Sequence, residues 1–251
     1  MKFKIFNESP EILDQCRIFV AGWHGLGETG YITVTHLVQE LNLTRCATIL
    51  SSGAPPFISV QDNRLRLPFE IYAGQNHDLA IFVPHLQPYR HVQIEFSEKL
   101  SEWILNHPNL EVAYFLGGVD EVLKAGDNPL QYIPSRAFYT YQNVPDGFIN
   151  EVRENLLDPG LFVAGPLAVT LGYLDINMFP AVGILAYAAR DRPDPLAAVS
   201  AVNKLNTLLK VDVSTEMLIE NAQKIQEQIK RQLAPIEETD RDKDLSRRMY
   251  T

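Results

Sequence analysis

The sequence predicts an α/β fold: a three-layer domain with a central, largely parallel sheet, followed by C-terminal helices and a flexible C-terminal tail. The first observation is a series of short apolar, β-rich runs at residues 17–21, 46–50, 79–83, 111–116, 137–141 and 182–187. Most of these runs are apolar on both faces, which is typical of parallel strands covered by helices. The second observation is that segments with helical periodicity separate them. The third is a sharp change of composition after Pro235.

Three helices are predicted within the domain. The first has an apolar stripe at Tyr31, Val34, Leu37, Val38 and Leu41. The second has its stripe at Ile94, Leu100, Trp103, Ile104 and Leu105. The third is expected over residues 195–209, because a turn-like Asp-Arg-Pro-Asp segment precedes it.

A longer helix is predicted over residues 214–233, where it ends before Pro235. Its apolar residues Leu218, Ala222, Ile225 and Ile229 are spaced four, three and four apart, the spacing of a coiled-coil seam. Two interpretations stay open. The stripe packs on its own domain, or it joins copies of the chain into a homo-oligomer. The expected organisation is therefore one domain at residues 1–234 and a tail at residues 235–251.

The composition excludes several classes of protein. With 46% hydrophobic and 21% charged residues, the chain can bury a sizeable core. A net charge of −9 argues against general binding of nucleic acid, which needs clustered cations. The N-terminus lacks a signal-type apolar core and no apolar stretch reaches membrane-spanning length. We therefore expect a cytoplasmic protein with no membrane partner, and expect Cys16 and Cys46 to be buried, reduced thiols.

The glycine-rich segment at residues 22–30 follows a predicted strand and precedes a helix, the position of phosphate-binding loops. Its spacing matches a P-loop except that Glu28 stands where the lysine would be. Because a carboxylate repels a triphosphate, we expect no nucleotide and no other cofactor here. The glycines are predicted to serve a tight turn and a close backbone approach, with a subunit contact as one reason for it.

No catalytic or metal-ligating residue is predicted. The six histidines form no helical His-x-x-x-His pair and have no cysteine partner nearby in the sequence. His85 and His91 are expected to lie in a solvated loop. Asp120 and Glu121 follow a predicted strand, where turn formation and helix capping explain them better than acid–base chemistry.

The last residues of the chain form the predicted partner-binding site. The almost fully charged stretch at residues 237–244 offers no face for a core and predicts a mobile tether. The chain then ends in Met249, Tyr250 and Thr251. A hydrophobic residue, a tyrosine and a free carboxylate can enter a pocket on another protein together, because each finds a different kind of partner there.

Several sequence blocks, in this order, resemble the proteasome assembly chaperone family, in particular its archaeal branch, which is related to the second eukaryotic assembly chaperone. They are FVAGWHGLGETG (19–30), SSGAPP (51–56), LPFEIY (67–72), DLAIFV (78–83), YFLGG (114–118) and VAGPL (163–167). The closing helices also fit, so the resemblance covers roughly residues 15–230. Each block alone is a weak motif, and the order makes the match more specific.

The resemblance implies a non-enzymatic, ATP-independent, self-associating protein that engages the proteasome core particle. Its relatives can carry the same hydrophobic-Tyr-X ending as proteasome activators. By that analogy Met249 would fill a slot between α subunits, Tyr250 would contact the segment beneath the gate, and the Thr251 carboxylate would pair with a pocket lysine. Two alternatives remain: an α/β enzyme of the nucleoside-phosphorylase type, and an oligomeric scaffold whose terminal tyrosine is incidental.

Overall fold

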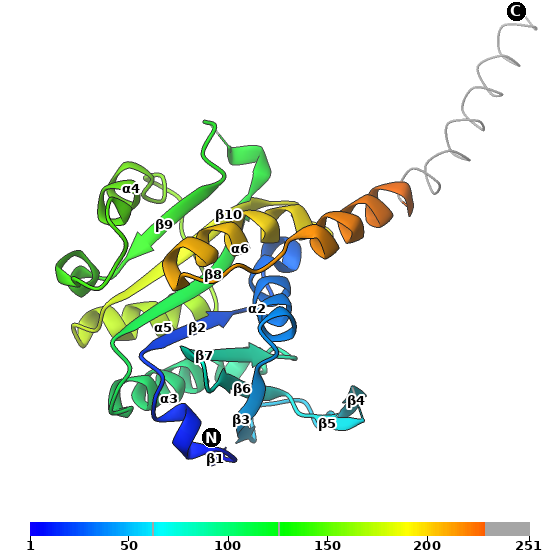
Figure 1. Cartoon of the computed structure of the whole chain (residues 1–251), viewed down its shortest axis with the longest axis vertical. Helices are drawn as coiled ribbons and strands as arrows, with labels where there is room; N and C mark the ends of the chain where they lie inside the picture. Colours follow the sequence, from blue (N-terminus) through cyan, green and yellow to red (C-terminus); the bar gives the residue numbers. More distant parts are fainter. Residues whose placement is uncertain (62, 125, 229–251) are drawn as a thin grey trace, which may run out of the picture.

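The computed structural model describes residues 1–61, 63–124 and 126–228. Its centre is an eight-stranded sheet (Figure 1). The strands follow the order β1 (Phe3–Asn7), β3 (Thr44–Ser51), β6 (Phe69–Gly74), β7 (His77–Pro84), β2 (Ile18–Gly22), β8 (Val112–Asp120), β10 (Ala181–Ala188) and β9 (Leu130–Pro134). The four neighbours β7, β2, β8 and β10 are parallel, and the antiparallel pairs lie on either side of them. The predicted α/β fold class is confirmed.

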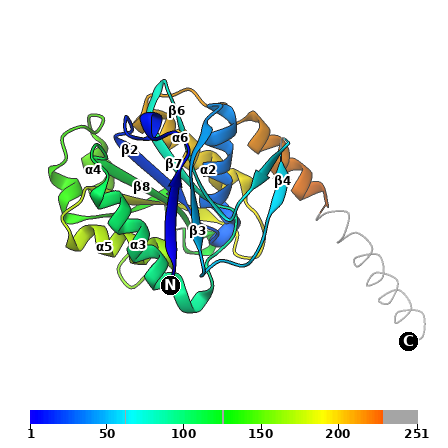
Figure 2. The ribbon, with the colours of Figure 1, turned by 90° about the horizontal axis from the view of Figure 1, so that it is seen from below.

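Helices cover both faces of the sheet, which makes the three layers. On one face α2 (Thr29–Glu40) packs against α6 (Pro195–Leu209). On the other face α3 (Gln93–Asn106) packs against α5 (Pro166–Ile176) (Figure 2). The shorter elements are α1 (Pro10–Leu13), α4 (Phe148–Glu154), the 3₁₀ helices η1 (Leu26–Glu28), η2 (Arg90–Val92), η3 (Glu121–Leu123) and η4 (Arg136–Thr140), and a separate hairpin of β4 (Ser59–Gln61) and β5 (Arg64–Arg66).

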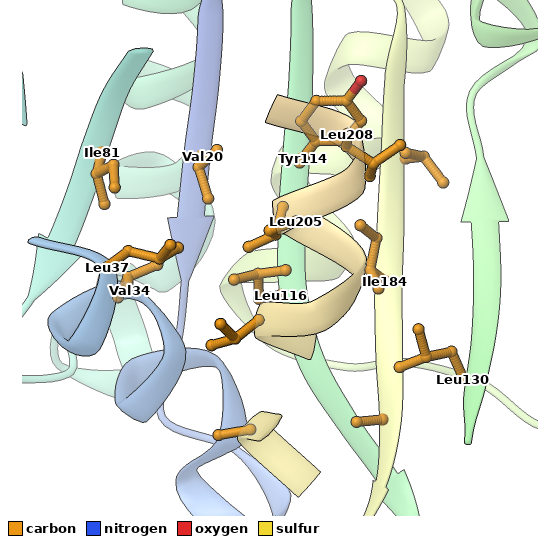
Figure 3. Close-up of a cluster of buried hydrophobic side chains, with 14 of the residues drawn as sticks. Val20, Val34, Leu37, Ile81, Tyr114, Leu116, Leu130, Ile184, Leu205 and Leu208 are labelled. Carbon is orange, nitrogen blue, oxygen red and sulfur yellow. The ribbon is translucent and has the colours of Figure 1, made fainter. Parts of the chain in front are cut away.

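Each face of the sheet has its own hydrophobic core. Successive side chains of a strand point to opposite faces. Val20 therefore belongs to the core under α2 and α6, whereas Phe19 belongs to the core under α3 and α5. Figure 3 shows Leu37 of α2 and Leu205 of α6 among the side chains of the first core. Because both faces are buried, the inner strands need apolar residues throughout, which accounts for the runs seen in the sequence.

The strand predicted at residues 137–141 is wrong. These residues form the 3₁₀ helix η4 and its end, and the strand of this region is β9, immediately before it. Phe138 is buried and packs edge-on against Phe148 of α4, with ring centroids 5.9 Å apart. The apolar character of the run therefore comes from burial of one side of a tight turn. The sequence also predicts none of β1, β4, β5 and β6.

The helix predicted at residues 214–233 is helical over 216–228, and its remainder lies outside the described residues. Leu218 and Ala222 are buried, with exposed fractions of 4% and 5%, and Leu218 belongs to the core under α2 and α6. Ile225 is half-buried. The described part of the stripe therefore packs on its own domain, as the first of the two interpretations has it. Self-association through this helix is untested.

Both cysteines are buried free thiols, as predicted. Neither Cys16 nor Cys46 has exposed surface. Burial raises the pKa of the Cys16 thiol to about 12, and it also raises the pKa of the Cys46 thiol. Both groups therefore behave as small apolar side chains in the core under α3 and α5.

Asp194 joins the start of α6 to the end of β10. Its carboxylate accepts hydrogen bonds from the backbone N–H of Ala197, at 3.1 Å, and of Ala189, at 3.0 Å. We expect Asp194→Ala to lower the free energy of unfolding by about 1–2 kcal/mol, because the helix loses its N-cap. Urea denaturation measures this change. The control is Asp191→Ala, since the Asp191 side chain is 83% exposed. Equal denaturation midpoints for the two variants would contradict the capping role.

Candidate functional site

The predicted partner-binding residues Met249, Tyr250 and Thr251 lie outside the described residues, as does the charged stretch at 237–244. Their role stays a prediction. What the structure describes is the helix at 216–228, which leads toward them and leaves the body beside α6 (Figure 1). It also describes the glycine-rich segment and a crevice beside it.

The glycine-rich segment is a site of close backbone packing. A Cβ atom on Gly22 would lie 2.0 Å from the backbone oxygen of Gly30, and one on Gly30 would lie 2.3 Å from that of Leu116. Gly27 has a φ of 62°, in the left-handed region that glycine adopts at little cost. The predicted tight turn and close backbone approach are therefore confirmed. They bring β2, α2 and β8 together without intervening side chains.

A crevice of about 590 Å³ opens where β2, β8 and β10 end. The carboxyl ends of parallel strands are the usual place for ligands in α/β sheets. Its walls include Leu26, Val119, Leu161, Phe162 and Leu167. Two polar atoms of its lining residues, Trp23 Nε1 and Gln87 Oε1, are buried and have no hydrogen-bond partner among the described residues.

The ionisable side chains His24 and Asp120 of the crevice already interact with other groups of the protein. The ring of His24 stacks on Tyr31, its Nε2 lies 2.9 Å from the backbone oxygen of Pro84, and burial lowers its pKa. The Asp120 carboxylate pairs with Arg190 at 2.8 Å. It also accepts from the backbone N–H of Val122 at the start of η3, which confirms the predicted capping role. The described residues that line the crevice include no serine, threonine or cysteine.

His85 does not lie in a solvated loop, and this prediction is wrong. Its side chain is only 4% exposed, and its Nε2 lies 2.9 Å from Oε2 of Glu70. Its Nδ1 lies 3.3 Å from the hydroxyl of Tyr31. His85 follows the last residue of β7 directly, and its backbone N–H donates to the carbonyl of Pro68, so the ring is held against β6. His91, farther along, is exposed as predicted.

Glu70 is the buried charge that the sequence reasoning missed. Its side chain is 1% exposed. Burial alone raises its pKa, but hydrogen bonds from His85, Tyr72, the backbone N–H of Leu67 and Arg45 together lower the pKa to about 2. The carboxylate is therefore ionised over the whole physiological range. The signal that marks it is an acidic residue inside the apolar run LPFEIY at residues 67–72.

Among the described residues, no three His, Cys, Asp or Glu side chains are grouped closely enough to ligate a metal ion. None of the helices in this part of the chain has the length and hydropathy needed to cross a bilayer.

Residues 19–233 match the PAC2 family, and the chain belongs to this family. It is similar to an uncharacterized protein of Methanocaldococcus jannaschii, with 23% identity over 228 residues, which cover 90% of this chain and 89% of the relative.

Two solved structures from Pyrococcus furiosus share the fold. PbaA, described as an archaeal homolog of proteasome-assembly chaperone, is 22% identical, with a TM-score of 0.74 over 94% of this chain and 99% of PbaA. PbaB, described as an archaeal proteasome activator, is 18% identical, with a TM-score of 0.71 over 92% of this chain and 98% of PbaB. The similarity extends over nearly the full length of both relatives.

Proposed function

We propose that this chain is a non-enzymatic, ATP-independent proteasome assembly chaperone or activator-like protein of the cytoplasm. It inserts its last three residues into pockets between α subunits of the proteasome core particle. The observation that carries the proposal is a hydrophobic-Tyr-X ending, Met249-Tyr250-Thr251, on a chain of the PAC2 family. The fold shared with PbaA and PbaB, whose descriptions name proteasome assembly and activation, supports it.

Each of the three terminal groups makes a different kind of contact with the pocket. Met249 fills an apolar slot, the Tyr250 phenol finds a hydrogen-bond partner, and the Thr251 carboxylate pairs with a lysine of the pocket. One tripeptide buries little surface and binds weakly by itself, because association also costs translational and rotational freedom. A homo-oligomer that presents several tails raises their effective concentration at the ring and strengthens the attachment.

Removal of Met249–Thr251 tests the proposal. We expect the truncated protein to lose comigration with core particles and with isolated α rings, because the docking groups are gone. Its melting temperature and sedimentation should not change, since none of the described core residues is touched. Tyr250→Ala should weaken binding about tenfold or more, as expected for a buried aromatic anchor.

The matched control is Ser246→Ala, which alters the same end of the chain and keeps the tripeptide. Unchanged binding of the truncated protein would contradict tail docking, and so would an equal loss in the control. Core-particle peptide hydrolysis, measured on the same samples, separates gate opening from assembly.

The crevice at the ends of β2, β8 and β10 gives the enzyme alternative a specific observation. Its buried Trp23 Nε1 and Gln87 Oε1 have no partner among the described residues, and a bound base could supply both. Turnover of a nucleoside with phosphate, or a rise in melting temperature with either compound, would support a nucleoside-phosphorylase-like activity. Ring binding that persists without the tripeptide would instead favour the oligomeric scaffold.

A further inference from the structure

A second cavity, of about 520 Å³, lies between α2 and β5. We call it the arginine pocket, because Arg45, Arg64 and Arg66 line it. The amide side chains of Gln39, on α2, and of Asn42, in the turn after α2, also line it. It shares no lining residue with the crevice at the ends of the parallel strands. Its volume is in the range of small-molecule sites in proteins.

The floor of the arginine pocket is already saturated with hydrogen bonds. Oε1 of Glu70 accepts from Arg45 Nη1 at 2.8 Å and from the backbone N–H of Leu67 at 2.9 Å. Oε2 faces His85 Nε2 at 2.9 Å and accepts from the hydroxyl of Tyr72. Groups of the protein therefore satisfy both carboxylate oxygens of Glu70, so no free acceptor remains at the floor of the pocket to bind a cation.

Arg45 is likewise fixed by the protein. Besides Glu70, its Nη1 donates to the backbone oxygen of Leu65 at 2.8 Å, and its Nε lies 2.9 Å from a carboxylate oxygen of Glu8. These contacts attach the hairpin to β3. Arg45 therefore shapes the pocket and has little capacity left for a ligand.

Arg64 and Arg66 differ from Arg45 in having no such partners. In the part of the chain that the structure describes, neither guanidinium makes an ion pair or side-chain hydrogen bond. The two residues are two positions apart on β5, so they project to the same side of the hairpin. Burial raises the pKa of the Tyr31 and Tyr72 hydroxyls, and the positive charge of Arg66 partly opposes both rises. The Arg66 guanidinium is therefore close to Tyr72, which lies at the floor of the pocket.

The lining of the pocket has three arginines and two glutamates, Glu8 and Glu70, and so carries an excess of positive charge. The chain as a whole has the opposite sign, with a net charge of −9. A guanidinium binds carboxylate and phosphate groups through two parallel hydrogen bonds. We infer that the arginine pocket binds a small soluble anion, whose carboxylate or phosphate group is held by Arg64 and Arg66. Gln39 and Asn42 line the same pocket and can hydrogen-bond the remaining polar atoms of the anion.

Titration of the full-length protein with citrate, inorganic phosphate and AMP, at constant ionic strength, tests the inference. Calorimetry and thermal shift are the two measurements. We expect at least one of these anions to bind once per chain and to raise the melting temperature. Arg64→Gln and Arg66→Gln should each weaken that binding about tenfold or more, because each removes charge-assisted hydrogen bonds.

The matched control is Arg153→Gln, which removes the same charge from α4, where the guanidinium lies 5.3 Å from the ring centre of Tyr139. It should leave binding unchanged, since Arg153 does not line the pocket. The inference is overturned if none of the three anions binds, or if the control weakens binding as much as the pocket variants. It is also overturned if a hexaglutamate peptide binds and the small anions do not, because the surface would then be a contact for an acidic protein. None of these variants alters the last three residues of the chain.

Discussion

Gly30→Ala is expected to lower the free energy of unfolding by at least about 3 kcal/mol. A Cβ atom at this position would lie 2.3 Å from the backbone oxygen of Leu116 and 2.8 Å from the backbone nitrogen of Trp23. These are atoms of β8 and of the loop after β2, so neither can move without disturbing the pairing of the two parallel strands. Gly30 has no left-handed φ, and the expected loss is therefore purely steric.

Urea denaturation measures this loss, and Gly172→Ala is its control. Gly172 lies within α5, and a Cβ atom there would meet nothing within 4 Å. Alanine at Gly172 should be neutral or stabilise the protein by up to about 1 kcal/mol, because glycine is the poorer helix former. A Gly30→Ala protein as stable as the wild type would show that α2 is not held against β8 as described.

Glu70→Ala is expected to lower the free energy of unfolding by about 3–5 kcal/mol, the usual loss when one partner of a buried ion pair is removed. The variant leaves the Arg45 guanidinium, the Tyr72 hydroxyl and His85 without their shared acceptor. Glu70→Gln should cost less, because one oxygen remains to accept hydrogen bonds. Thermal or urea denaturation at neutral pH measures both changes, and near-equal stability of all three proteins would contradict the prediction.

The same carboxylate should make stability depend on pH. The pKa of Glu70 falls from 4.5 to about 2 on folding, so the folded protein binds fewer protons than the unfolded chain between these values. Its contribution is present in full above about pH 4.5 and is lost as the pH falls toward 2. The expected loss is about 3 kcal/mol. The stability difference between the wild type and Glu70→Gln should therefore shrink over this interval, whereas a constant difference would contradict the prediction.

Strands β2, β3, β7, β8 and β10 could be predicted from the sequence, because burial leaves an apolar run in each of them. The edge strands β1 and β9 could not be predicted, and neither could β6, an inner strand whose apolar run is interrupted by Glu70. In β1 the side chains of Phe3 to Phe6 alternate between half-buried and exposed, and charged Lys4 interrupts the apolar run. The run at residues 137–141 predicts a strand because Phe138 and its neighbours are apolar. Burial against α4 produces the same composition in a 3₁₀ helix, so composition could not distinguish the two.

The network around Glu70 was beyond sequence reasoning for a different reason. An acidic residue inside a strand normally indicates a solvent-facing position. The partners that reverse this expectation are Arg45 on β3 and His85 after β7, which come together only when β6 pairs with both strands. The close packing at Gly22 and Gly30 was predictable, because a glycine-rich turn between a strand and a helix has few other physical explanations.

The reactivity of the two buried cysteines can report local opening of the folded protein. The thiolate is the form that attacks maleimides, and burial in the folded protein suppresses it at both Cys16 and Cys46. Alkylation of the native protein would therefore proceed only through molecules that have opened locally. Cys16 lies just before β2 at the centre of the sheet, and Cys46 lies in β3 near its edge. Comparing the two labelling rates would measure local opening at the centre and near the edge of the sheet separately, with no engineered probe.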